Sequence, residues 1–164
     1  MLKRDEVLCI LNYNPETGVF TRRKSGRGKR SAEGDVAGVI DKDGYLRITL
    51  LGGRYYAHRI AWLILNGKWP TGSIDHINGN RSDNRSSNLR DVSVSVNLQN
   101  LRGAMASNKT TGLLGASYES SSGKYRAQIM CKGKKITIGR FDTKEQAHNA
   151  YLEAKRIMHE GCSI

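Results

Sequence analysis

Regular alternation of apolar and polar residues is clearest in the C-terminal third of the chain. Between residues 124 and 131 the apolar positions fall on every second residue, which predicts a strand with one apolar and one polar face. Residues 114–118 and 135–141 predict two further strands, separated by turns at 119–123 and 132–133. The pattern therefore predicts a three-stranded sheet whose apolar side needs a cover.

A predicted helix that could cover this sheet follows directly. Residues Thr143 to Gln146 have the polar pattern in which the first and fourth side chains exchange hydrogen bonds with the backbone at a helix N-terminus. Helical spacing then brings one set of apolar residues to a single face. This face consists of Ala147, Ala150, Tyr151, Ala154 and Ile157.

Shorter elements are predicted in the N-terminal half. Val7, Leu8 and Leu11 fall at helical spacing, and Gly67 with Pro70 is a stop signal for a second helix. The predicted elements are a helix at 3–12, a strand at 19–21, a hairpin at 35–51 and a helix at 55–66, with turns at 13–18, 41–44 and 52–53.

The chain is strongly basic, with 27 Lys and Arg against 15 Asp and Glu and an isoelectric point near 9.9. This balance favours a polyanionic partner. An anionic membrane competes for this charge, but the longest apolar run, at residues 60–65, is far too short to span a bilayer. Residues 1–13 lack the features of a signal peptide, so we expect a cytoplasmic protein that is not secreted. Cys9, Cys131 and Cys162 are widely separated, which indicates free thiols.

The densest positive charge lies at residues 22–30, where six of nine residues are basic and none is acidic. This segment could be a solvated loop or an arm that follows phosphate groups. We favour the arm, because so dense a cluster repels itself unless an anion is nearby.

Candidate chemistry is concentrated between Ile74 and Asn100. Asp75 and His76 end a short apolar run, so we expect them to project from a strand toward opposite faces. A carboxylate that binds metal beside an imidazole that acts as a base meets the needs of phosphodiester hydrolysis. Asn97 follows in a segment that could be helical, and oxygen ligands of this kind suit Mg²⁺ rather than zinc.

The order Asp75-His76, Asn88-Leu89-Arg90, Asn97 resembles the HNH nuclease motif. The flanking segments HRIAW and GKWP are similar to those of phage members of that family. The resemblance implies a ββα-metal fold with His76 as general base, and with Asp75 and Asn97 as ligands of one Mg²⁺ or Mn²⁺. It also implies that Asn88 hydrogen-bonds within the loop and steadies both the hairpin and the base.

The role of His58, in the predicted helix at 55–66, stays open. One interpretation is a core histidine satisfied by a hydrogen bond. The other places it near the metal or the scissile phosphate, where Arg59 beside it would be a phosphate contact.

A second resemblance covers residues 112–158. The segments YRAQI, IGRFDT and AHNAY resemble the ethylene-response-factor (Apetala-type) DNA-binding domain, which implies that the three-stranded sheet enters the major groove. The expected fold class is α+β, with a ββα-metal HNH nuclease domain followed by a small three-stranded antiparallel sheet packed on one helix. The expected division is an HNH nuclease domain with a β-rich basic region at 1–104, a linker at 105–111 and a DNA-binding domain at 112–164.

These observations predict a metal-dependent DNA endonuclease of the phage homing type, acting in the cytoplasm of the infected host cell. Its partner would be double-stranded DNA, and we expect a monomer that nicks one strand, with a dimer left open. One alternative is a non-catalytic, sequence-specific DNA-binding protein on a nuclease scaffold. An RNA-binding protein fits the charge but lacks an aromatic RNA-binding motif. The candidate DNA contacts are Arg22, Arg23, Lys24, Arg27, Lys29, Arg30, Arg59, Arg81, Arg85, Arg90, Arg102, Lys124, Arg126, Gln128 and Arg140.

Overall fold

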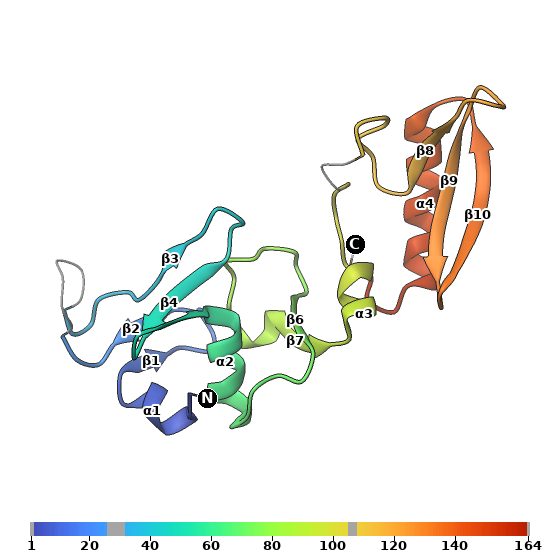
Figure 1. The fold of residues 1–164 in the computed structure, drawn as a ribbon. Coiled ribbons are helices and arrows are strands. Elements are labelled where there is room, and N and C mark those ends of the chain that lie inside the picture. The colour runs from blue at the N-terminus through green and yellow to red at the C-terminus, as the bar shows by residue number, and fades with distance from the viewer. Residues whose placement is uncertain (1, 26–31, 105–107, 164) are drawn as a thin grey trace. The chain divides into compact units, whose positions relative to one another are not determined.

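The chain forms two compact units, Met1–Val94 and Ser95–Ile164 (Figure 1). The computed structural model describes residues 2–25, 32–104 and 108–163. In these ranges no helix has both the length and the apolar character that a membrane crossing requires. The predicted domain division at 1–104, 105–111 and 112–164 stays a prediction, and residues 105–107 of its linker lie outside the described residues.

Short antiparallel strands and two helices build the first unit. Strand β1 pairs with β2, β4 lies between β3 and β5, and β6 pairs with β7. The elements are α1 (Arg4–Leu8), β1 (Leu11–Tyr13), β2 (Phe20–Arg22), β3 (Val39–Ile40), β4 (Leu46–Leu50), β5 (Gly53–Tyr56), α2 (Ala57–Asn66), β6 (Ser73–His76), the 3-10 turn η1 (Ser86–Asn88) and β7 (Leu89–Val92).

The predicted hairpin at 35–51 is confirmed by the pairing of β3 with β4. Its turn is held by Asp41, whose Oδ1 accepts hydrogen bonds from the backbone N–H groups of Asp43 and Tyr45, both at 3.0 Å. A carboxylate that bonds its own downstream backbone is the usual turn chemistry of Asp.

Both predicted N-terminal helices are too long. The first ends at Leu8, and Leu11 instead enters β1, where it is fully buried opposite Arg22. The second begins at Ala57, because Tyr55 and Tyr56 pair with β4 as part of β5. In both cases pairing with the neighbouring strand of a hairpin overrides the local helical spacing. The predicted stop is confirmed, since Gly67 ends α2 with a φ of 72°.

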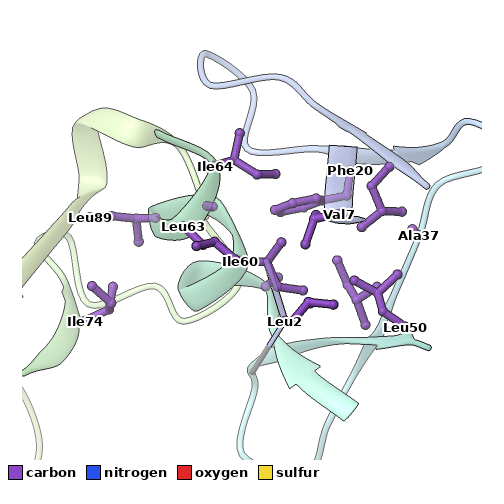
Figure 2. Packing of buried hydrophobic residues seen from close by; sticks show 14 residues of the cluster. Leu2, Val7, Phe20, Ala37, Leu50, Ile60, Leu63, Ile64, Ile74 and Leu89 are labelled. Atoms are coloured by element: carbon purple, nitrogen blue, oxygen red, sulfur yellow. The ribbon is translucent and has the colours of Figure 1, made fainter. Parts of the chain in front are cut away.

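Helix α2 lies at the centre of the first core. Ile60 and Ala61 are fully buried, and Figure 2 shows the α2 side chains between Ile74 and Leu89 on one side and Phe20 and Leu50 on the other. The core thereby fixes the pair β6–β7, which carries the candidate chemistry, to the helix.

The second unit contains a three-stranded antiparallel sheet in the order β10-β9-β8 with α4 packed on it. Its small core contains Ala116, Ala127 and Ala147. The predicted cap is confirmed, because Thr143 Oγ1 accepts from the Gln146 N–H at 3.2 Å and the Gln146 side chain accepts from the Thr143 N–H at 3.3 Å. The elements are α3 (Val94–Gln99), β8 (Ala116–Glu119), β9 (Lys124–Cys131), β10 (Lys134–Phe141) and α4 (Lys144–Met158).

The buried face of α4 differs from the predicted one near its end. Ile157 is 85% exposed, whereas Lys155 is 1% exposed and donates from Nζ to the backbone oxygen of Leu101. Helical spacing could not reveal that a carbonyl from a distant segment would accept this hydrogen bond. The fold is thus a mixed α and β structure, and the ββα-metal layout of β6, β7 and α3 stays a prediction.

Candidate active site and charged sheet face

Strand β6 carries both residues of the predicted catalytic pair. Asp75 pairs in register with Arg90 of β7, and His76 pairs with Leu89. Both Asp75 and His76 are only 5% exposed. The expectation that they project from a strand is confirmed, and the sheet and core hold them in place.

An ion pair occupies part of the Asp75 carboxylate. Arg90 approaches Asp75 Oδ2 through Nη2 at 2.7 Å and through Nε at 2.8 Å. The pair follows from the register, since directly opposite residues on two strands have neighbouring side chains. Arg90, a predicted phosphate contact, thus bonds Asp75 in this structure.

The imidazole of His76 is kept neutral by its surroundings. Burial lowers the pKa of His76, and this effect outweighs the opposing influence of Asn84 and the carboxylates of Asp75 and Asp83. Its Nε2 lies 3.5 Å from Asn84 Oδ1. A neutral imidazole is the form that can accept a proton from water.

His58 lies beside His76, with ring centroids 5.0 Å apart and ring planes at 88°. It is 7% exposed, and burial, followed by the electrostatic influence of His76 and Arg59, lowers the pKa of His58 to about 3. It is buried as a core histidine would be, yet no described atom is a hydrogen-bond partner for its Nδ1.

Asn88 closes the loop after β6. Its Oδ1 accepts from the Asn78 N–H at 2.8 Å and its Nδ2 donates to the Asp83 backbone oxygen at 2.8 Å. Asp83 in turn bonds Arg85 at 2.6 Å, and this hydrogen bond lowers the pKa of Asp83 to about 2. Asn88 therefore acts on the loop, and Asn84, carried by that loop, places its Oδ1 3.5 Å from His76 Nε2.

The hairpin β1–β2 contacts this loop and stabilises it through hydrogen bonds. Tyr13 donates its hydroxyl to the Asn84 backbone oxygen at 2.7 Å, and burial raises the pKa of Tyr13 to about 12. The Pro15 oxygen accepts from the Ser86 N–H at 2.9 Å. A Cβ on Gly18 would lie 2.6 Å from the backbone of Asn84 and Arg85, so this contact requires glycine.

Two arginines lie over aromatic rings next to the histidines. Arg47 lies 4.2 Å from the Tyr56 ring centre and pairs with Asp41 at 2.7 Å. Arg81 lies 5.0 Å from the Tyr45 ring centre. These cations add positive potential beside the buried pair.

The candidate metal ligands fit a site in which the protein supplies few of the ligands. Across residues 2–25, 32–104 and 108–163, no group of three or more His, Cys, Asp or Glu residues is placed to hold a metal ion. Asp75 offers carboxylate oxygen, a hard donor suited to Mg²⁺, although its Oδ2 bonds Arg90. Asn97 lies in α3, which is helical as expected, within the second unit, and it stays a predicted ligand. Water and phosphate oxygens would complete such a site.

Several predicted DNA contacts have partners within the chain. Arg85 bonds Asp83, Arg102 donates to the Ser163 backbone oxygen at 3.1 Å, and Lys124 lies 3.2 Å from Asp142. Arg22 is half-buried, Arg23 and Lys24 are exposed, and Arg59 lies 6.0 Å from the Trp69 ring centre. Arg27, Lys29 and Arg30 lie outside the described residues.

The outer face of the C-terminal sheet is organised by one acid. Glu119 of β8 accepts from Arg126 of β9 at 3.0 Å and from Arg140 of β10 at 2.5 Å. The hydrogen bonds from Arg140 and Ser122 lower the pKa of Glu119 to about 2. Gln128, also predicted to contact DNA, bonds Thr137 on the same face at 3.2 Å.

Tyr45, Asn84 and Glu119 were missed by the sequence analysis. Tyr45 comes from the β3–β4 hairpin, far from the motif, and contacts both histidine rings. Asn84 lies in an Asn-rich loop whose composition indicates turn formation as readily as chemistry. Glu119 is the one acid in the three strands of the sheet, of which β9 and β10 are basic, and this is the available signal for its role.

Comparison with known proteins supports the nuclease motif. Residues 55–99 match the HNH endonuclease family. A solved structure of the HNH homing endonuclease I-HmuI, which binds and cleaves DNA, is similar at 20% identity and a TM-score of 0.44 over 93% of this chain and 88% of that one. This likeness is too distant to assign residue roles. No curated protein matches the chain. The comparisons give no support for the ethylene-response-factor resemblance of residues 112–158, which stays a prediction.

Proposed function

We propose that this protein is a DNA endonuclease that hydrolyses phosphodiester bonds with His76 as general base. The observation that carries the proposal is a buried histidine with a lowered pKa beside the Asp75 carboxylate, within a segment that matches HNH endonucleases. Neither the family match nor the buried pair alone would be enough, because buried histidines are common in protein cores.

In the proposed reaction His76 accepts a proton from the water that attacks phosphorus. The Asn88 hydrogen bonds hold the loop that carries Asn84 against this ring. One Mg²⁺ or Mn²⁺ ion, held by Asp75 and the predicted ligand Asn97, would supply stabilisation of the negative charge on the phosphate and the departing 3′ oxygen. Exposed cations such as Arg81 would contact neighbouring phosphates.

A single His76–Asp75 site per chain would cut one strand, so we propose nicking by a monomer. A phage homing role in the host cytoplasm, and targeting by the C-terminal sheet, are further parts of the proposal. The sheet presents Lys124, Arg126 and Arg140 on its polar side, which is suited to a polyanion.

Cleavage of supercoiled plasmid and phage genomic DNA tests the proposal. Wild-type protein should nick DNA with Mg²⁺ or Mn²⁺ and be inactive with EDTA. His76→Ala should lose about 10²-fold or more in rate, the usual contribution of a general base. His148→Gln in the second unit is the matched control, since that ring bonds the Leu114 oxygen instead.

Normal cutting by His76→Ala would rule out His76 as the general base. Cutting in EDTA would rule out a required metal ion. Tight DNA binding without any cutting would favour a second candidate, a non-catalytic DNA-binding protein. The specific observation in favour of that candidate is the ion pair between Arg90 and the proposed ligand Asp75. Open-circle product would indicate nicking, and linear product would indicate cleavage of both strands.

A further inference from the structure

Four aromatic rings from three segments of the first unit meet around the proposed base. Tyr45 precedes β4, Tyr56 ends β5, His58 lies in the first turn of α2 and His76 ends β6. We call these four residues the ring cluster. The His58 ring contacts the other three, with centroid distances of 5.4 Å to Tyr45, 5.2 Å to Tyr56 and 5.0 Å to His76.

The buried imidazole of His58 has no evident structural purpose as a polar group. Its Nδ1 is buried without a hydrogen-bond partner among the described atoms, a situation that is usually destabilising. An apolar side chain would fill the same space without that penalty. Its low pKa agrees with a ring that stays neutral. A neutral imidazole carries one N–H, and since Nδ1 has no acceptor we assign the proton to Nε2.

The contact between His58 and His76 is geometrically specific. The two ring planes are nearly perpendicular, at 88°, which is the edge-to-face arrangement that aromatic rings favour. Tyr56 stacks on His58 with an interplanar angle of 16°, so His58 is itself held in place. Asn84 Oδ1 approaches the His76 ring at a long 3.5 Å, which is a weak restraint.

We propose that His58 is a positioning residue that fixes the plane of the His76 ring for proton transfer. The proposal rests on the proposed function, because it requires His76 to be the base. His58 acts through His76 and does not contact the phosphate or the water. The stacking of Tyr56 on His58 and the edge-to-face contact of His58 with His76 would thus carry the orientation of β5 and α2 to the ring of the proposed base.

Single-turnover cleavage by the full-length protein provides the first test. His58→Ala should lower the cleavage rate by about 10²-fold with little change in the dissociation constant for DNA, because misplacement of a catalytic group slows the chemical step. His58→Phe keeps a ring against His76 and should recover most of the rate. Ile60→Ala, a fully buried residue on the same helix outside the ring cluster, is the control for lost packing.

Imidazole NMR of the same variants provides a measurement that does not depend on activity. His58→Ala should shift the His76 ring protons, broaden them, or both, whereas Ile60→Ala should leave them in place. In the wild type the two-bond proton–nitrogen correlations should show His58 as the Nε2–H tautomer.

The outcomes separate this proposal from the proposed function. Wild-type cleavage by His58→Ala, or an unchanged His76 spectrum in that variant, would overturn the positioning role. Loss of rate in Ile60→Ala equal to that in His58→Ala would overturn it too, since any packing defect would then suffice. If the wild type fails to cut, the nuclease proposal fails, and the NMR comparison still decides whether His58 orders the His76 ring. If His58→Phe does not fold, His58→Ala and Ile60→Ala decide the question.

Discussion

Each unit of the chain pairs acidic with guanidinium groups, but in opposite surroundings. In the first unit Asp75 is buried and bonds one arginine across two strands. In the second unit Glu119 bonds two arginines across three strands, and Arg140 has a side chain that is 53% exposed.

The difference in burial gives the two pairings different consequences. A buried ion left without its partner is strongly destabilising, whereas an exposed pair contributes little to stability. We therefore expect the Asp75–Arg90 pair to matter for the fold of the first unit. The Glu119 cluster should matter for how the sheet meets a partner, because it fixes the directions of two cations.

The largest effect on stability is expected from Arg90→Ala. Loss of the guanidinium leaves the Asp75 carboxylate buried without it, which should destabilise the first unit by about 3 kcal/mol. Trp62 and Trp69 are the two tryptophans of the chain and both lie in the first unit, so urea unfolding followed by tryptophan fluorescence measures this unit. Asp75→Asn in the Arg90→Ala background should recover part of the loss. A change below about 0.5 kcal/mol, the size typical of surface sites, would contradict the prediction.

Per pH unit, the next largest effect is acid destabilisation of the first unit. The folded pKa of His58 is about 3 and the unfolded value is near 6.5, so the unfolded chain binds more protons between these limits. Stability from this group is therefore fully present above pH 6.5 and is lost as the pH falls toward 3, at up to about 1.4 kcal/mol per pH unit.

Urea unfolding of wild type and His58→Phe at several pH values would measure this dependence. The variant should show a shallower pH slope, and the slope that remains should include the contribution of His76, whose pKa is also lowered. An identical slope in both proteins would show that His58 does not titrate as its burial predicts.

A smaller effect is expected from Thr143→Ala in the second unit. This substitution removes the Oγ1 that accepts from the Gln146 N–H, and loss of such a cap usually costs about 1 kcal/mol. Far-UV circular dichroism should show a lower melting temperature for α4, while the tryptophan transition of the first unit stays where it was. Thr143→Ser keeps a hydroxyl and serves as the control.

The smallest effect on stability is expected from Glu119→Gln, which should leave the melting temperature almost unchanged. It removes one negative charge and releases Arg126 and Arg140, so non-specific affinity for DNA should rise at low salt, with a steeper salt dependence. Titration of a labelled duplex at several salt concentrations measures both. Unchanged affinity and slope would argue against contact of this sheet face with DNA. Glu153→Gln, at an exposed position of α4, controls for the change in net charge.

Local signals predicted the elements whose causes are local. The cap at Thr143, the stop at Gly67 and the strand that carries Asp75 and His76 follow from residues within a few positions of each other. The helix at 3–12 was wrong beyond Leu8 because Leu11 pairs with a strand later in the chain.

The residues of the candidate site also fall into those that local sequence predicted and those that depend on contacts between separate segments. The ordered motif predicted Asp75, His76 and Asn88, and the structure places all three around β6 and its loop. Tyr45 and the Asp75–Arg90 ion pair depend on how separate hairpins pack, so their roles could not be derived from spacing. The buried Nδ1 of His58 is likewise visible only once the surrounding atoms are in place.

The Asn88 side chain has a consequence for how the loop after β6 could diversify. Because one amide bonds Asn78 at one end and Asp83 at the other, the four residues from Gly79 to Ser82 form a loop tip whose base is closed by the Asn88 side chain. Replacements or insertions at this tip would change only the tip. The backbone on either side of the Asn88 hydrogen bonds would keep its position next to His76. The loop tip is therefore a place where new side chains can be displayed beside the proposed base, as loops do on other rigid scaffolds.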